Sequence, residues 1–318
     1  MSKFKVGLIS VGSHCQTNII PSLIEMNDVE IVGFYTRNSD TISQIREKYN
    51  INYYESVDDM LALPSINFVY ISSPNSLHHS FIMKSLERDK SIIVEKTAVG
   101  DLIEAKEVVA LANSKNLLVY EAFMYKHHQQ FARLKNILDS KIYGEVKKVF
   151  INFGFPHLKS GDIRYSQELN GGALYDAGAY TVSAMNALFG DTQLVCSNME
   201  KAGHNVDVTG YAVFSACDNV ICFLNWGFGL SYKNEIHIWT DKEIITVDRA
   251  FAKPKTLKAA IFHDANGQRY LDSEVSCNHF TNMFDFVFNL DTSKYKTVNN
   301  ELINQMLTLD VIMKGSKS

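Results

Sequence analysis

The chain has 318 residues, of which 46% are hydrophobic and 21% are charged, and its formal net charge is −4 at pH 7. This composition is typical of a globular protein long enough for two domains with a sizeable core. The sequence contains no basic run and no run of roughly 20 apolar residues, which argues against binding to nucleic acid and against a membrane span.

The cysteines and histidines show no metal-binding pattern. The five cysteines are scattered without a C-x-x-C pair, and the paired histidines at 78–79 and 127–128 lack the spacing of zinc ligands. We therefore expect reduced thiols and no metal site. The first residues lead directly into an apolar strand and do not resemble a secretory signal, so we expect a cytoplasmic protein.

The first 122 residues alternate apolar runs with helical patterns. We expect strands at 3–9, 28–36, 66–72, 91–94 and 117–120, and helices ending near 26 and at 40–49, 76–88 and 101–113. This alternation predicts an α/β domain, residues 1–122, with a doubly wound parallel sheet of the Rossmann type. Ligands of such sheets bind at the carboxyl ends of the strands.

The pattern changes after Phe123. We expect one helix at 129–138, strands at 145–155, 191–201, 207–216, 219–227, 232–240 and 242–248, and helices near 278–289 and 301–313. This predicts an α+β domain, residues 123–318, with a mainly antiparallel sheet. The run at 220–224 is apolar on both faces, so we expect helices on one side and a second subunit on the other, in a dimer or tetramer.

The turn after the first strand resembles an incomplete dinucleotide fingerprint, G-x-G-x-x-G/A. Ser10, Gly12 and Cys15 occupy the three glycine positions, and Gly12 is the one that the pyrophosphate approaches most closely. We expect Gly12, Ser13 and His14 to contact the cofactor. An ordinary strand–turn–helix is the alternative.

The end of the second strand bears on the choice of cofactor. Thr36 and Arg37 stand where an acid usually binds the ribose hydroxyls of NAD, and an arginine there suits the 2′-phosphate of NADP. We therefore favour NADP(H), with NAD(H) possible. The alternative is an exposed arginine at the start of a loop.

Two further strand ends carry polar residues. Ser73, Asn75 and His78 follow the strand at 66–72, and Glu95 and Lys96 follow the strand at 91–94. We expect the first three and Glu95 to contact the cofactor. At this edge a lysine can polarise a carbonyl or lower the pKa of a neighbouring phenol, although a Lys–Glu pair on a loop is usually solvated.

The segment 171–190 reads as a helix with two faces. Apolar residues gather on one side, whereas Asp176, Tyr180 and Ser183 gather on the other. Gly171 and Gly172 allow close approach to the helix start. This pattern predicts one wall of an active site, with a surface carboxylate and a half-buried phenol as the alternative.

Together these motifs resemble the glucose–fructose oxidoreductase / inositol dehydrogenase (Gfo/Idh/MocA) family. The matching stretches are S-P-N-S-L-H (73–78), E-K (95–96), E-A-F-M-Y-K-H-H (121–128) and G-G-A-L-Y-D-A-G-A-Y (171–180). The resemblance implies an NAD(P)-dependent oxidoreductase in which Lys96, Asp176 and Tyr180 are catalytic. Ser10, and Thr97 in place of a proline, depart from the family pattern.

Within the family the chain is most similar to nucleotide-sugar 3-ketoreductases of deoxysugar biosynthesis. This implies NADPH-dependent reduction of a sugar keto group, expected at C3 of a nucleotide-linked 4-keto-6-deoxy sugar. Tyr180 is the expected proton donor beside Lys96, with the reverse assignment open. The expected substrate contacts are Tyr125, His128, Arg164, Tyr165 and Tyr232.

Three other functions stay open at this point. The chain could be a dehydrogenase of a free sugar, an inositol or a diol. It could be a cofactor-binding regulator without turnover. Ser10 and Thr97 favour this alternative, whereas intact Lys96, Asp176 and Tyr180 argue against it. It could also be a redox-assisted glycosidase that recycles bound NAD.

Overall fold

The computed structural model describes residues 4–316 and divides into two compact units. The first unit runs to Ala122 and takes in Phe280–Met306, and the second comprises Phe123–His279 and the chain from Leu307 on. The predicted boundary after residue 122 coincides with the division between the units. The return of 280–306 to the first unit was not predicted from the sequence.

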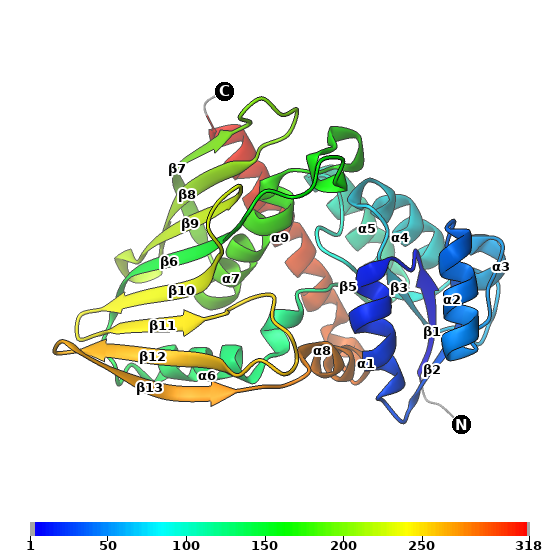
Figure 1. Ribbon diagram of the computed structural model, residues 1–318, viewed down its shortest axis with the longest axis horizontal. Helices are drawn as coiled ribbons and strands as arrows, with labels where there is room; N and C mark the ends of the chain where they lie inside the picture. Colours follow the sequence, from blue (N-terminus) through cyan, green and yellow to red (C-terminus); the bar gives the residue numbers. More distant parts are fainter. Residues whose placement is uncertain (1–3, 317–318) are drawn as a thin grey trace. The chain divides into compact units, whose positions relative to one another are not determined.

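The first unit contains a parallel five-stranded sheet in the order β2-β1-β3-β4-β5 (Figure 1). Its strands match the five predicted positions: β1 (Phe4–Ile9), β2 (Val29–Tyr35), β3 (Phe68–Ile71), β4 (Ser91–Val94) and β5 (Val119–Glu121). The chain goes from β1 to β2 on one side and continues with β3 on the other. The winding direction therefore reverses between β1 and β3, where doubly wound sheets bind their ligands.

Helices cover this sheet, and the strands β1, β3 and β4 are almost wholly buried. They are α1 (Ile20–Ile24), α2 (Ser39–Tyr49), α3 (Val57–Leu61), α4 (His78–Glu87), α5 (Leu102–Ser114), α8 (His279–Phe288) and the first part of α9 (Tyr295–Gly315), with single turns η1 (Cys15–Ile19), η2 (Asn75–Leu77) and η8 (Thr292–Lys294). Phe288 of α8 stacks on Phe4 at 4.9 Å between ring centroids and meets Phe68 edge-on. These ring contacts explain why α8 belongs to the first unit.

The second unit contains an eight-stranded sheet in the order β13-β12-β11-β10-β6-β9-β8-β7. The strands are β6 (Val146–Phe155), β7 (Thr192–Glu200), β8 (Thr209–Ala216), β9 (Ile221–Phe228), β10 (Lys233–Thr240), β11 (Ile244–Asp248), β12 (Ala259–Ala265) and β13 (Gln268–Val275). All neighbours are antiparallel except β6 and β9. The sequence predicted six of these strands and missed β12 and β13.

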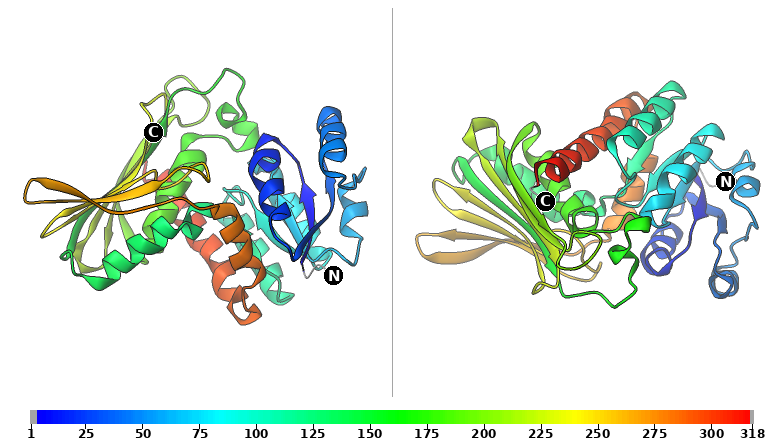
Figure 2. Two further views of the ribbon diagram at one scale, coloured as in Figure 1. Left: turned by 60° about the horizontal axis from the view of Figure 1, so that its bottom comes forward. Right: turned by 90° about the horizontal axis from the view of Figure 1, so that it is seen from above.

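One face of this sheet packs against helices. The helical segments of the unit are α6 (Gln129–Ser140), α7 (Ala179–Phe189), the end of α9 and the turns η3 (Met124–His127), η4 (Ile163–Tyr165), η5 (Gln167–Leu169), η6 (Leu174–Gly178) and η7 (Cys217–Asn219). Helix α7 packs on β6 and β9, and α6 packs on β12 and β13, on the same side of the sheet (Figure 2). Among residues 4–316 no helix has the length and apolar character needed to cross a membrane.

Candidate active site

The turn after β1 forms the first part of the predicted cofactor site. Gly12, Ser13 and His14 are exposed, and a Cβ added to Gly12 would meet nothing within 4 Å, so a ligand can approach the backbone there. Ser10 adopts φ 66°, a left-handed conformation that favours glycine, which is the residue the fingerprint has at this position. Burial raises the pKa of Cys15 to about 12, so its thiol is protonated at neutral pH.

The residues present fit a dinucleotide at the point where the sheet reverses. Ser73, which follows β3, is 7% exposed, and its hydroxyl has no hydrogen-bond partner among the described residues. A buried hydroxyl without a partner is costly, and a ligand group can satisfy it. Thr36 is also buried at the end of β2, whereas Arg37 is exposed there and available to a phosphate.

Glu95 is the centre of a polar network in front of Lys96. It accepts a hydrogen bond from the Tyr70 hydroxyl, and its carboxylate lies 3.0 Å from His14 Nε2. Asn18 in turn bonds His14 Nδ1 at 3.1 Å. Although burial alone would raise the pKa of Glu95, the charge and hydrogen bond of His14 and the Tyr70 hydroxyl lower it to about 2. The network therefore keeps Glu95 ionised and fixes the segment that carries Lys96.

His78 and Thr97 link that segment to the end of β3. One ring nitrogen of His78 lies 2.8 Å from the Thr97 carbonyl oxygen, and the other lies 2.8 Å from that of Ser73. The Thr97 hydroxyl accepts a hydrogen bond from Asn75 at 3.3 Å. His78 is fully buried, and this burial lowers the pKa of its ring. A neutral ring has one N–H, so His78 donates to either the Thr97 or the Ser73 carbonyl oxygen, and we assign it to holding these two segments together.

The helical segment with Asp176 and Tyr180 begins with a π-helical turn, η6, and continues as α7. The sequence places Asp176, Tyr180 and Ser183 on one face of this helix, and on that face the side chains of Tyr180 and Ser183 are buried. Tyr180 is 6% exposed and packs among Phe123, Phe153 and Phe251 at ring separations of 5.2–5.6 Å. Its hydroxyl donates to the Met124 sulfur at 3.6 Å. The ring of the phenol therefore lies within an aromatic cluster.

Asp176 is joined to the loop before the helix. Its carboxylate lies 2.9 Å from Arg164 Nε, and Arg164 also pairs with Asp162 at 3.2 Å. Asp176 is 17% exposed at the side chain and Arg164 is 42% exposed. In the same loop Tyr165 stacks on His204 at 4.7 Å. This arrangement places a guanidinium beside Asp176, on a loop that also carries Tyr165.

The other predicted substrate contacts lie in the second unit in different surroundings. Tyr125 is fully buried and its hydroxyl donates to Ser183 at 2.9 Å. His128 is 1% exposed and caps α6 by accepting the Gln130 amide proton at 3.1 Å. Tyr125 supports the fold around Tyr180 and His128 supports that around α6, and their contact with substrate stays a prediction. Tyr232 is 45% exposed, with Arg249 over its ring.

The structure thus assembles two groups of predicted residues. One group, in the first unit, gathers at the carboxyl ends of β1 to β4, and the other surrounds the start of α7 in the second unit. Two residues were not predicted from the sequence: Tyr70, which bonds Glu95, and Asp207, which bonds the start of η6. Tyr70 lies within the buried strand β3, and Asp207 is 33 residues beyond Leu174, the residue that it bonds. No sequence motif therefore marked either residue as part of the site.

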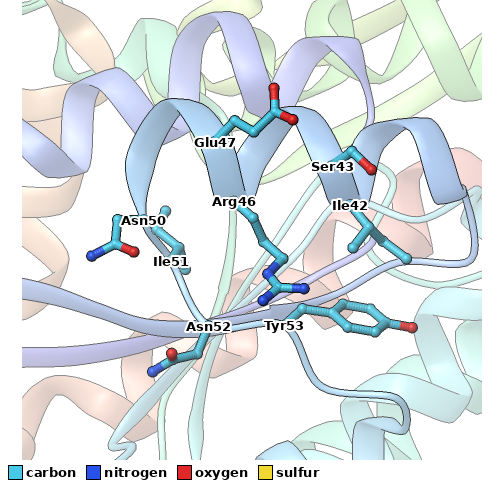
Figure 3. A pocket seen from close by; sticks show the side chains of 8 residues that line it. All are labelled: Ile42, Ser43, Arg46, Glu47, Asn50, Ile51, Asn52 and Tyr53. Carbon is cyan, nitrogen blue, oxygen red and sulfur yellow. The ribbon is translucent and has the colours of Figure 1, made fainter.

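A separate cavity of about 550 Å³ lies beside α2. Figure 3 shows Arg46 reaching from this helix towards the segment that carries Tyr53, with Ile42 and Glu47 nearby. None of the predicted site residues lines it. Within residues 4–316 no cluster of three or more histidine, cysteine or acidic side chains has metal-binding geometry.

Comparison with family models matches both parts of the chain. Residues 4–123 match the model described as "Oxidoreductase family, NAD-binding Rossmann fold", and residues 131–246 match "GFO/IDH/MocA C-terminal domain".

Individual proteins extend the similarity. The dTDP-3,4-didehydro-2,6-dideoxy-alpha-D-glucose 3-reductase of Saccharopolyspora spinosa is 29% identical over 83% of this chain and 80% of its own length. The trans-1,2-dihydrobenzene-1,2-diol dehydrogenase of Xenopus laevis is 25% identical over 58% of this chain and 56% of its own. The crystal structure of a 3-ketoreductase from Actinomadura kijaniata with NADP and TDP-benzene superimposes with a TM-score of 0.91 at 23% identity, covering 99% of this chain and 98% of the other. This last likeness shows the fold.

Proposed function

The chain belongs to the GFO/IDH/MocA family of oxidoreductases, and from that premise we propose that it is an NADPH-dependent reductase of a sugar keto group. The proposed substrate is a nucleotide-linked 4-keto-6-deoxy sugar, and the proposed reacting carbon is C3. The similarity to the Saccharopolyspora spinosa 3-reductase over most of both chains supports this substrate class.

The cofactor would be held at the carboxyl ends of β1 to β4. Gly12 admits the pyrophosphate, the Ser73 hydroxyl offers a partner for a polar group, and exposed Arg37 suits a 2′-phosphate. The matching description "NAD-binding Rossmann fold" supports this placement, and the NADP of the Actinomadura kijaniata 3-ketoreductase supports NADP over NAD. When bound, the reduced nicotinamide supplies a hydride.

Residues of this chain then donate the proton to the substrate carbonyl and stabilise the negative charge that develops on it. Negative charge develops on the carbonyl oxygen of the substrate, and the Tyr180 hydroxyl donates a proton to it. The Lys96 ammonium stabilises the developing charge and the phenolate that Tyr180 becomes. Asp176 and Arg164 hold the sugar and its diphosphate. The proposal requires Lys96 and Tyr180 to act on the same carbonyl.

The observation that carries the proposal is the surroundings of Tyr180. Its ring is enclosed by aromatic side chains, which hold it in one orientation, and its hydroxyl donates to the Met124 sulfur at 3.6 Å. One turn earlier, Asp176 is paired with an arginine from a loop that also bears Tyr165. A phenol whose ring is fixed by packing, one turn from a carboxylate that is paired with an arginine, is suited to proton donation.

The test is turnover of a dTDP-linked 3,4-diketo-2,6-dideoxy sugar, followed by NADPH oxidation, for wild type, Tyr180→Phe and Lys96→Met. We expect Tyr180→Phe to lower kcat by at least about 100-fold, the usual share of general acid catalysis. Its unfolding midpoint should stay close to that of wild type because phenylalanine keeps the buried ring and its aromatic contacts. Tyr175→Phe, which removes a phenol bonded to Met313 at 3.6 Å, is the matched control. Turnover of Tyr180→Phe within a few-fold of wild type would end the donor assignment.

A dehydrogenase acting on a free sugar or diol is the second candidate, which the similarity to the Xenopus laevis diol dehydrogenase favours. A panel of free sugars and diols with NADP, against nucleotide-linked keto sugars with NADPH, separates the two. The preferred substrate is the one with the higher kcat/KM. Absence of turnover with every carbonyl and alcohol of the panel would favour a regulator.

Two further parts of the proposal concern the state of the protein. The sheet face opposite α7 carries the stacked rings of Phe150 and Phe223, with Trp239 beside them and 43% exposed. We propose that a second copy of the chain covers this aromatic strip, because it is continuous across neighbouring strands.

The cysteines form no disulfide among residues 4–316, which is consistent with the proposed cytoplasmic location.

A further inference from the structure

The start of the segment that bears Asp176 and Tyr180 is bonded to a residue far away in the sequence. The first amides of a helix have no partner within it. Here Leu174 N–H donates to Asp207 Oδ2 at 2.7 Å, and Ala173 N–H donates to the Asp207 carbonyl oxygen at 2.9 Å. Asp207, which lies in the loop between β7 and β8, thus caps the amino-terminal end of the helix in place of a local N-cap residue.

The position of Asp207 is in turn fixed by a residue of the sheet. The indole N–H of Trp226, a fully buried residue of β9, donates to Asp207 Oδ2 at 3.4 Å. Gly178 lies over the same indole, where an added Cβ would be 3.1 Å from the ring. The cap therefore connects the helix start to the sheet through one side chain.

A glycine at the helix start makes room for this carboxylate. Gly172 adopts φ +120°, and a Cβ there would lie 2.4 Å from Asp207 Oδ1. Gly171 is equally confined, since its Cβ would lie 2.5 Å from the Arg164 carbonyl oxygen. The glycines that begin the G-G-A-L-Y-D motif are thus required by contacts with Asp207 and with the Arg164 loop, which gives this part of the motif a physical reason.

We propose that Asp207 is a positioning residue that sets the depth and rotation of η6 and α7, and through them the placement of Asp176 and Tyr180. Asp176 is two residues beyond the capped amide of Leu174, and Tyr180 is six. A shift of the helix start therefore moves both groups, and a displacement of about 1 Å can cost up to about 100-fold in rate. The role in turnover rests on the proposed function, whereas the capping role does not.

The test compares Asp207→Ala and Asp207→Asn with wild type. Asparagine keeps an oxygen that can accept the Leu174 and Trp226 protons, whereas alanine removes both bonds. Asp191→Ala, at an exposed position just beyond the other end of α7, is the matched control. Deuterium exchange of peptides covering 173–180 reports the helix start, and kcat and KM for NADPH report catalysis.

We expect Asp207→Ala to speed exchange at 173–180 by about fivefold to 30-fold, the factor that corresponds to a lost N-cap. It should lower kcat by about tenfold or more while KM for NADPH stays within twofold. Asp207→Asn should recover most of both losses, and Asp191→Ala should behave as wild type.

Unchanged exchange at 173–180 in Asp207→Ala would overturn the proposal. If Asp207→Ala fails to fold, the proposal is tested with Asp207→Asn alone. A kcat of Asp207→Asn far below that of wild type, with normal exchange at 173–180, would also overturn the proposal. If wild type itself reduces no keto sugar, the proposed function fails, and the exchange measurement still decides whether Asp207 caps the helix.

Discussion

Replacing Glu95 by glutamine should remove a charge that the first unit stabilises strongly. The surroundings lower the pKa of Glu95 from 4.5 to about 2, chiefly through His14 and Tyr70 acting against burial. At about 1.4 kcal/mol for each tenfold change in proton affinity, this corresponds to about 3 kcal/mol of folding free energy at most. Glutamine still accepts the two hydrogen bonds, so the loss measured for Glu95→Gln at pH 7 should be about 2–3 kcal/mol.

The pH dependence gives the sharper test. The folded-state pKa lies below that of the unfolded chain, so the unfolded chain takes up this proton first as the pH falls. The contribution of Glu95 is complete well above pH 4.5 and disappears towards pH 2, given its folded pKa of about 2. The difference in unfolding free energy between wild type and Glu95→Gln should therefore shrink by roughly 1 kcal/mol between pH 7 and pH 4.

Urea unfolding followed by far-ultraviolet circular dichroism, without cofactor, measures both quantities. Glu87→Gln, at an exposed carboxylate at the end of α4, is the control and should show neither effect. This stability prediction is refuted if Glu95→Gln is as stable as wild type at pH 7. It is equally refuted if the difference between the two proteins does not change with pH.

Three further changes test other parts of the site and the fold. Arg37→Gln should raise KM for NADPH by about tenfold to 100-fold and leave KM for NADH nearly unchanged, since a charged hydrogen bond to phosphate is lost; equal effects on both cofactors would contradict this. Ser10→Gly should raise the free energy of unfolding by up to about 1 kcal/mol, because φ 66° strains serine; a thermal or urea midpoint clearly below wild type would contradict this. Trp239→Lys should lower the molar mass measured by light scattering after gel filtration, because it places a charge in the aromatic strip; an unchanged mass would move the subunit contact elsewhere.

The sequence by itself determined the alternating order of the first domain and the chemistry available to the site. Buried parallel strands are continuous apolar runs with turn residues at their ends, so each of β1 to β5 could be predicted from its own short stretch of sequence. The motifs around Gly12, Lys96, Asp176 and Tyr180 were readable for the same reason: each lies within a few consecutive residues. Strand β13 was not, because an exposed edge strand such as Q-R-Y-L-D-S-E-V has no apolar run to mark it.

Only the tertiary structure decided how these pieces are held. The burial of Tyr180 and Ser183 depends on Phe123, Phe153 and Tyr125, which arrive from other elements, so a helical wheel could not predict it. The ionised state of Glu95 depends on His14 and Tyr70, and the helix start depends on Asp207, 33 residues beyond the amide that it caps. Local spacing records which side chains a segment carries, whereas burial and hydrogen bonding depend on neighbours that only the folded chain brings together.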